Sequence, residues 1–513
     1  MLSQLKSKFP SFGTTQNDTD DLNKAAVEER ANDEKLPAKL GSETSSVGEE
    51  EFEDPNLAPS GLNYEEVTAG GMGRHLGVFT CTLMIVGRVI GTGIFSTPSS
   101  ILGSVGSVGA SMMLWVLGFV LSFCGLFIWL EFGTMIPRSG GEKVYLEAVY
   151  TKPRYLATIV FAANAILLGF TAAGCIVFAE NILVSAGVEA TQWNERGIAL
   201  GVIFFVTFLH GFTPRLGIFI MNILSVFKIV ILLFVVITGW VVLSGRAHIQ
   251  DPHANFRDAF AGSSHSSYDY ATATFKVLNA YTGWSAVNYV MNNVKDPVRT
   301  LKIAGPLGLG ICAVLYMLAN VAYFAAATKE EIENTGVTVA SLFFYNVFGE
   351  TAQRALTVFV ALSALGYIII ILGPPPSVAY PFILDVEGYP GQIINFFIVI
   401  GLFWFRWRKP NIPRPFKVWW PIALFYLAAA VFLLVAPFLR PPGGIGDTPP
   451  LPYYLYCLVG IAIMLAGVVY WAAWRILPRL FGYEYIGRKE TLADGTVVAL
   501  FSAQKIQKGE VDS

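Results

Sequence analysis

Charged residues are scarce in this 513-residue sequence: they make up 14% of the chain, whereas hydrophobic residues make up 54%. So little charge excludes a single soluble domain, whose surface needs many more polar groups. The 35 basic and 37 acidic residues nearly cancel, so the net charge gives no reason to expect nucleic acid as a partner. The composition predicts an all-α polytopic membrane protein that has the lipid bilayer as its surroundings.

Cysteine is also rare, and no pair of cysteines has the spacing of a metal site. All five lie in apolar stretches, where we expect them to be core residues, and we expect neither a metal nor another cofactor. The predicted spans contain no paired carboxylates, no nucleophile with a histidine and no metal cluster, so an enzyme is a remote interpretation. The five are Cys81, Cys124, Cys175, Cys312 and Cys457.

The N-terminus lacks the apolar core of a cleavable signal peptide. Residues 1–72 are rich in Ser, Thr, Asp, Glu and Lys, which predicts a disordered cytoplasmic tail. Residues 73–480 form the predicted membrane domain, and 481–513 form a second polar tail, also cytoplasmic. The first span is then the insertion signal.

Eleven apolar segments are long enough to cross a bilayer, at about 20 residues for ~30 Å of hydrocarbon. They lie near 76–105, 109–136, 156–186, 197–213, 217–244, 271–293, 304–327, 353–372, 378–405, 419–439 and 454–477.

The distribution of Lys and Arg in short loops sets the orientation, because basic loops stay on the cytoplasmic side. With the N-terminus inside, the rule holds through the seventh span. An eighth and a ninth span would then export the most basic loop, Arg406 to Lys417. We therefore predict that one crossing is missing near 365–373, and that 353–372 joins the start of one span to the end of another. The alternative is a real span with inverted or dual topology.

The first span is interrupted at mid-depth by Gly91-Thr92-Gly93. A second helix is expected to begin with Thr97 as N-cap and Pro98 as its first residue. A helix that stops and restarts within a membrane exposes backbone N–H and C=O groups, which is tolerated where they line a cavity. The alternative is a glycine-eased kink at a helix crossing.

The sixth span is interrupted in the same manner, by small and polar residues between Asn279 and Tyr289. Interrupted helices at matching places in two halves are the best sequence pointer to a transporter site. The first and sixth spans match if a five-span repeat is used twice in inverted orientation. Taken alone, this stretch is also compatible with a hydrated helix end.

Ionisable residues within spans are costly and therefore point to function. Lys228 in the fifth span is a candidate for exchanging a proton with the cavity, and snorkelling toward the cytoplasmic surface is the alternative. Arg88, beside the first break, could bind a carboxylate or pair with an acid such as Glu180.

Four ordered motifs resemble an amino-acid permease of the amino acid–polyamine–organocation (APC) superfamily, and most closely fungal high-affinity methionine permeases and L-type transporters. The motifs are RVIGTGIF at 88–95, EFGTMIPRSGGE at 131–142, HGFTPRLGI at 210–218 and NYVMNNVKDPVRTLKIAGPL at 288–307. The resemblance implies a LeuT-like fold of twelve spans, with a five-plus-five inverted repeat, broken helices 1 and 6, and alternating access around a midplane site.

The resemblance also implies the roles of particular residues. The backbone N–H groups of the first break would hold the substrate carboxylate, and carbonyls of the second break would hold its ammonium group. Lys228 matches a lysine that stands in for sodium in proton-coupled members. Asn279 departs from the family, since L-type members commonly have an aromatic gate there. The substrate-binding residues would be Gly91, Thr92, Gly93, Ile94, Ala280, Tyr281, Thr282, Gly283 and Trp284.

The leading functional hypothesis is a plasma-membrane permease that imports a neutral amino acid, methionine or another large apolar one, by symport with a proton. A second hypothesis is a transporter-like nutrient sensor, or a truncated variant that does not transport because the missing span leaves a pocket without a working cycle.

Overall fold

The computed structural model describes residues 74 and 76–505, except for 169–172, 190, 213, 248, 364–375, 442–443, 445, 447 and 492–496. The described chain is mostly helical, which agrees with the predicted class. Helices that fall on the predicted spans are α3 (Val78–Val89), α4 (Thr92–Val105), α5 (Val108–Met135), α7 (Leu156–Leu168), α8 (Ala173–Ala186), α9 (Gln192–Phe212), α10 (Pro214–Leu243), α12 (Ser267–Ala280), η2 (Ala286–Asn293), α13 (Pro297–Ala326), α16 (Glu350–Ser363), α17 (Pro376–Arg408), α18 (Trp420–Val435) and α19 (Leu455–Arg475).

Shorter helices lie in the connections between these. They are α6 (Glu142–Val149), α11 (Ala254–Arg257), α14 (Lys329–Asn334), α15 (Val339–Phe348), η3 (Ala436–Phe438) and α20 (Leu477–Leu480). By length and composition, six helices of the described residues can each cross a membrane, and α3 with α4 forms a seventh, bent span. The described residues therefore support a polytopic membrane protein, while the count of eleven stays a prediction.

The predicted break in the first span is confirmed, because α3 and α4 meet at an angle of 41°. The predicted restart is wrong. Helix α4 begins at Thr92, with Gly91 as N-cap, so Pro98 lies inside the helix and Thr97 does not cap it. The Thr97 hydroxyl instead donates to the Gly93 carbonyl, 2.7 Å away, one turn back. Two residues make the break: Ile90 (φ −69°, ψ 96°) and Gly91 (φ −131°, ψ −153°) both have extended backbones, and the helix resumes at Thr92.

The interruption in the sixth span is also present. Helix α12 ends at Ala280, a turn follows, and the chain continues as the 3₁₀ helix η2. The start of α3 is joined to the end of η2 by two backbone hydrogen bonds, from Leu76 N–H to Asn293 O (2.9 Å) and from Lys295 N–H to Leu76 O (2.8 Å). The two broken spans are thus held together at this end of the bundle.

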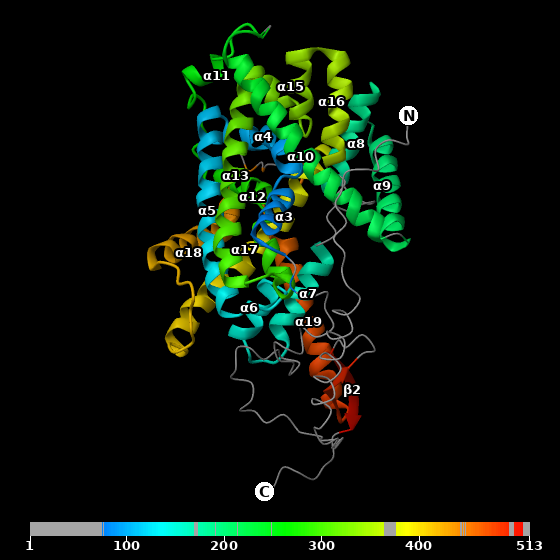
Figure 1. The fold of residues 1–513 in the computed structure, drawn as a ribbon, viewed down its shortest axis with the longest axis vertical. Coiled ribbons are helices and arrows are strands. Elements are labelled where there is room, and N and C mark those ends of the chain that lie inside the picture. Colours follow the sequence, from blue (N-terminus) through cyan, green and yellow to red (C-terminus); the bar gives the residue numbers. More distant parts are fainter. Residues whose placement is uncertain are drawn as a thin grey trace, which may run out of the picture. The chain divides into compact units, whose positions relative to one another are not determined.

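Helix α13 runs from one end of the bundle to the other. Near its start, Lys302 donates to the carbonyl of Pro415 in the basic loop (2.8 Å). At its other end, the Ala326 carbonyl accepts from the side chain of Asn346 in α15 (3.0 Å). We call the first the basic end; α6 lies toward it and α15 and α16 lie at the opposite end (Figure 1).

The directions of α16 and α17 bear on the prediction that one crossing is missing between them. Helix α16 directly follows α15, so it starts at the opposite end, and its 14 residues are only about 21 Å long. Helix α17 finishes at the basic end, so it too runs from the direction of the opposite end. Two consecutive spans cannot both run the same way without a return crossing between them.

The C-terminal region contains a β-hairpin, for which the sequence predicted only a polar tail. Strands β1 (Tyr483–Thr491) and β2 (Val497–Lys505) pair antiparallel, with Tyr483 opposite Lys505. Trp474 of α19 stacks on Tyr485 with ring centroids 5.4 Å apart. Arg479 donates a hydrogen bond to Glu484, which lowers the pKa of that carboxyl below its ordinary value.

Candidate functional site

The two breaks lie directly against each other. A Cβ atom added to Gly93 in α4 would lie 2.7 Å from both Cα and Cβ of Ala280, at the end of α12. Gly283, with φ at +121°, lies against Arg88, and an added Cβ would be 2.6 Å from Arg88 Cγ. Only glycine fits at either position, so the contact between the two interrupted helices depends on both.

The start of α4 presents hydrogen-bond donors. In an α-helix that begins at Thr92, the N–H groups of Thr92, Gly93 and Ile94 have no partner within the helix. No side chain caps this end. Gly91 and Thr92 are half-buried, while Gly93 and Ile94 are buried. A helix N-terminus of this kind favours a carboxylate, because its N–H groups and its dipole both point at the anion.

The ends of α3 and α12 present acceptors, and one side chain serves both. The Tyr316 hydroxyl of α13 lies 2.7 Å from the Val89 carbonyl and 3.0 Å from the Ala280 carbonyl. A hydroxyl has one proton, so it can donate fully to only one carbonyl at a time. Tyr316 was not singled out in the sequence, where it is one apolar-flanked tyrosine in a long span.

A cavity of about 340 Å³ opens beside the second break, which is within the size range of small-molecule sites. Of the predicted residues, Thr282, Gly283 and Trp284 line it, whereas Gly91 to Ile94, Ala280 and Tyr281 do not. Its other walls come from α5, α6, α7, α12, η2, α17 and α18. They combine apolar groups with amides, among them Phe161, Asn164, Phe275, Gln392, Ile394 and Asn395.

Two of the predicted residues face aromatic neighbours. Tyr281 is fully buried, and its ring packs on Tyr316 and Trp115, with centroids 5.1 and 5.9 Å away. Trp284 meets Trp129 edge to face, with centroids 5.3 Å apart. The nine predicted residues therefore divide into those at the contact between the breaks and those on the cavity wall.

Lys228 lies on α10, which packs against α3. Its side chain is half-buried, and the positive charge of Arg88 acts on it. The fold thus brings Lys228 to the helix that carries the first break, although the two are about 140 positions apart in the sequence.

A second lysine, which was not predicted as a site residue, lies within the span predicted at 271–293. Lys276 of α12 is fully buried, and its Nζ is 3.2 Å from Ser104 Oγ of α4. The charges of Asp385 in α17 and of Asp269 both act on it. Asp385 is 1% exposed, and its Oδ1 has no hydrogen-bond partner in the described part of the chain. The rule that drew attention to Lys228, a charge inside a predicted span, would have found Lys276 as well.

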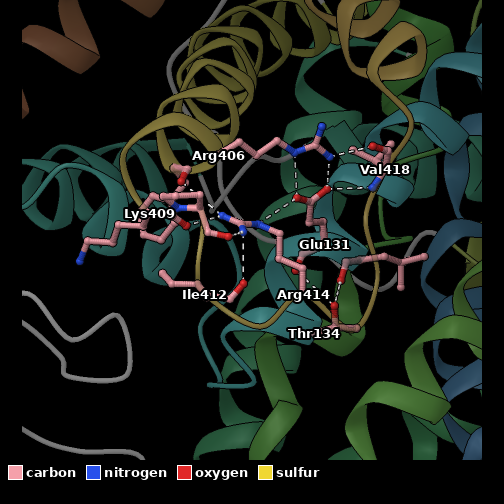
Figure 2. Close-up of polar contacts among 10 residues, drawn as sticks. Glu131, Thr134, Arg406, Lys409, Ile412, Arg414 and Val418 are labelled. Atoms are coloured by element: carbon pink, nitrogen blue, oxygen red, sulfur yellow. Dashed lines mark hydrogen bonds and ion pairs between the residues drawn. The ribbon is translucent and has the colours of Figure 1, made fainter.

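A buried charge cluster lies at the basic end (Figure 2). Glu131 of α5 accepts from Arg406 Nε at 3.0 Å and from the Val418 N–H at 2.8 Å, and Arg414 Nε is 3.6 Å away. Arg406 Nη2 bonds both Glu131 and the Val418 carbonyl. Arg414 also donates to the carbonyls of Phe405 and Lys409, where α17 ends. The cluster fastens the loop between α17 and α18 to α5.

The sequence profile of the amino acid permease family matches residues 76–372 and 365–463, which is more than half of the chain. The chain belongs to this family. It is 34% identical to the high-affinity methionine permease of Saccharomyces cerevisiae, over 82% of this chain and 83% of the relative. It is 29% identical to the low-affinity methionine permease of that yeast, over 83% of this chain and 87% of the relative. It is 28% identical to the human b(0,+)-type amino acid transporter 1, over 80% of this chain and 90% of the relative.

These relatives confirm the resemblance. Permeases and transporters are not enzymes, so the chain is an integral membrane transporter by family rather than a catalyst.

The alignment with the high-affinity permease also contains positions that this chain lacks. It has 479 positions, whereas 82% of 513 residues is about 421, so roughly 58 positions have no residue here. That length is enough for the one crossing of ~20 residues that the sequence predicts to be missing, together with its connections. The two stretches that match the family profile meet at 365–372, where the sequence predicts the missing crossing.

Proposed function

We propose that this protein imports a neutral amino acid, methionine or another large apolar one, across the plasma membrane together with a proton. The observation that carries the proposal is the contact of Gly93 with Ala280, which brings the N–H groups at the start of α4 together with the carbonyl ends of α3 and α12. A zwitterionic amino acid needs hydrogen-bond donors for its carboxylate and acceptors for its ammonium group. The methionine permeases among its relatives supply the choice of substrate.

In the proposed site, the substrate carboxylate accepts from the N–H groups of Thr92, Gly93 and Ile94. Its ammonium group binds carbonyls at the end of α12, near Ala280 to Thr282. The ammonium group competes with the Tyr316 hydroxyl for the Ala280 carbonyl. Tyr316 can then donate its hydrogen bond to the Val89 carbonyl instead. The substrate side chain extends along Gly283 and Trp284 into the cavity.

Alternating access then moves the two broken spans together, with both termini of the chain cytoplasmic. The Leu76 and Asn293 hydrogen bonds support this joint motion, because they join α3 to η2. Lys228 supplies the exchangeable proton. Its proximity to Arg88 supports the assignment, since the movement of α3 changes the field at the lysine.

A second candidate is a chain that binds an amino acid without transporting it, as a sensor or truncated variant. The parallel directions of α16 and α17 favour it, as do the roughly 58 unmatched positions. In this case the missing segment belongs between Leu365 and Gly373.

Uptake of radiolabelled methionine in a yeast strain without methionine permeases separates the two. We compare the 513-residue chain with a restored chain that carries the corresponding segment of the high-affinity permease. Uptake by the restored chain alone, with methionine-dependent thermal stabilisation of both, identifies a truncated permease. Uptake by both shows that this chain is sufficient. The absence of both uptake and stabilisation in the restored chain would refute the permease proposal.

A further inference from the structure

A cluster of tryptophans marks the turn between two membrane spans at the basic end. Trp404 and Trp407 lie in the last turns of α17, and Trp419 and Trp420 lie where α18 begins. All four are exposed, Trp407 at 73% and Trp419 at 70%. Tryptophan at the ends of spans is typical of the membrane–water interface, where the ring meets both acyl chains and headgroups. This turn therefore lies at headgroup level.

The cations of the same turn fall into two groups. Arg406 and Arg414 are buried and committed to Glu131. Arg408 and Lys417 are exposed, and neither makes a hydrogen bond or ion pair in the described part of the chain. Arg408 lies over the ring of Trp404, with its Cζ 5.3 Å from the centroid, so one face of the guanidinium rests on the aromatic and its N–H groups stay available.

The buried cluster adds positive potential beneath this surface. One carboxylate, Glu131, faces two guanidinium groups, so the cluster carries a net charge of about +1. Arg406 Nη1 is buried without a hydrogen-bond partner among the described residues. Because the cluster also fixes the turn to α5, the exposed cations lie on a segment that is anchored to the helix bundle.

We propose that the turn between α17 and α18 binds the headgroup of an anionic phospholipid. Arg408 and Lys417 hold the anionic headgroup, and Trp404, Trp407 and Trp419 lie against its glycerol backbone and acyl chains. We call these five residues the lipid patch. Charge complementarity selects an anionic over a zwitterionic lipid, and the tryptophans select a lipid over a soluble anion. The proposal does not depend on the identity of the transported substrate.

Native mass spectrometry of the purified full chain tests the proposal, with phosphatidylserine and phosphatidylcholine added in equal amounts. We expect the wild-type chain to retain phosphatidylserine preferentially. A cation next to an anionic headgroup contributes about fivefold in affinity, so the double variant R408Q/K417Q should lose about thirtyfold. The double variant R246Q/R257Q is the control, because it removes two positive charges from exposed arginines at the opposite end, one of them paired with Asp251, and should retain the preference.

Two further arms define what would overturn the proposal. Added glycerophosphoserine, the headgroup without acyl chains, should not displace the lipid; displacement would identify a site for a soluble anion. W404A/W407A should weaken retention of both lipids while the chain stays folded by circular dichroism. Equal retention of the two lipids by the wild-type chain, or unchanged retention by R408Q/K417Q, would refute the lipid patch.

Discussion

Among single residues, Gly93 and Ala280 are the pair on which the proposed site depends, because the two interrupted helices touch there without a bulky side chain between them. Lys228 and Lys276 are ionisable side chains within apolar spans, where loss of hydration disfavours the charged form. Each of these residues gives a prediction whose result is independent of the others.

We expect Gly93→Val to abolish methionine uptake while the protein still reaches the membrane. The added Cβ would lie 2.7 Å from Ala280, so α4 and α12 must separate and the donors and acceptors move apart. Gly103→Val in the same helix is the control, because nothing lies within 4 Å of a Cβ there. Both are measured in whichever chain transports, the 513-residue or the restored one. Normal uptake by a correctly localised Gly93→Val protein would remove the broken helix from the mechanism.

We expect Lys228→Met to stop uptake or to free it from its dependence on external pH. Methionine keeps the apolar stem and loses the exchangeable proton. Lys143→Met, at a side chain that is 44% exposed, should leave the pH profile unchanged. If Lys228→Met keeps the wild-type profile of uptake between external pH 4.5 and 7.5, the lysine is a snorkelling residue only.

We expect Lys276→Met to destabilise the protein by about 3–5 kcal/mol, because it leaves the Asp385 charge buried without compensation. Adding Asp385→Asn should recover most of the loss. The thermal unfolding midpoint in detergent measures both. Equal destabilisation in the single and the double variant would show that the two charges do not compensate each other across α12 and α17.

At the scale of elements, the charge cluster of Glu131 decides where the turn between α17 and α18 lies. Two helices that are adjacent in the sequence are fixed here to α5, which precedes them by about 270 residues, and α17 cannot move without breaking these bonds. The lipid patch depends on the same fixed turn.

We expect Glu131→Gln to lower the free energy of unfolding by about 3–5 kcal/mol, since it leaves two buried guanidinium groups without their carboxylate. Glu484→Gln in the C-terminal hairpin is the control. That carboxylate is 35% exposed, and its loss should cost less than about 1 kcal/mol. Similar unfolding midpoints for the two variants would mean that the cluster contributes little to the stability of the turn.

At the scale of the whole molecule, the question is how many times the chain crosses the membrane. The basic turn lies at the same end as the loop after α5, as the charge rule requires. Helix α16 is too short to complete a crossing over its described length. The same direction of α16 and α17 therefore agrees with the prediction that a return crossing is missing between them.

We expect a cysteine placed at Asn411 to be labelled only from the cytoplasmic side. The five native cysteines are all buried, so background labelling should be low.

We further expect the genomic or transcript sequence to contain an in-frame segment between the codons for Leu365 and Gly373. Cytoplasmic labelling at position 411 together with full methionine uptake by the 513-residue chain would show that the protein functions without that segment.

Much of the fold follows from the sequence by itself. Apolar runs of about 20 residues can only be membrane helices, because backbone groups in a bilayer must bond within their own segment. The glycines at 91 and 93 and the polar stretch after Asn279 weakened two of these helices enough for both breaks to be predicted. The cysteines were correctly predicted to be buried, since a free cysteine behaves as a small apolar residue.

Only the tertiary structure decided which groups meet. Thr97 has the side chain of an N-cap, yet α4 starts five residues earlier, at Thr92, and its second residue, Gly93, packs on Ala280 of a distant helix. Tyr316, Lys276 and Asp385 carry no local signal of the partners that they have on helices distant in sequence. Periodicity and composition determine where a helix runs, but the pairing of a hydroxyl with two carbonyls, or of Glu131 with Arg406, depends on how the helices pack in three dimensions.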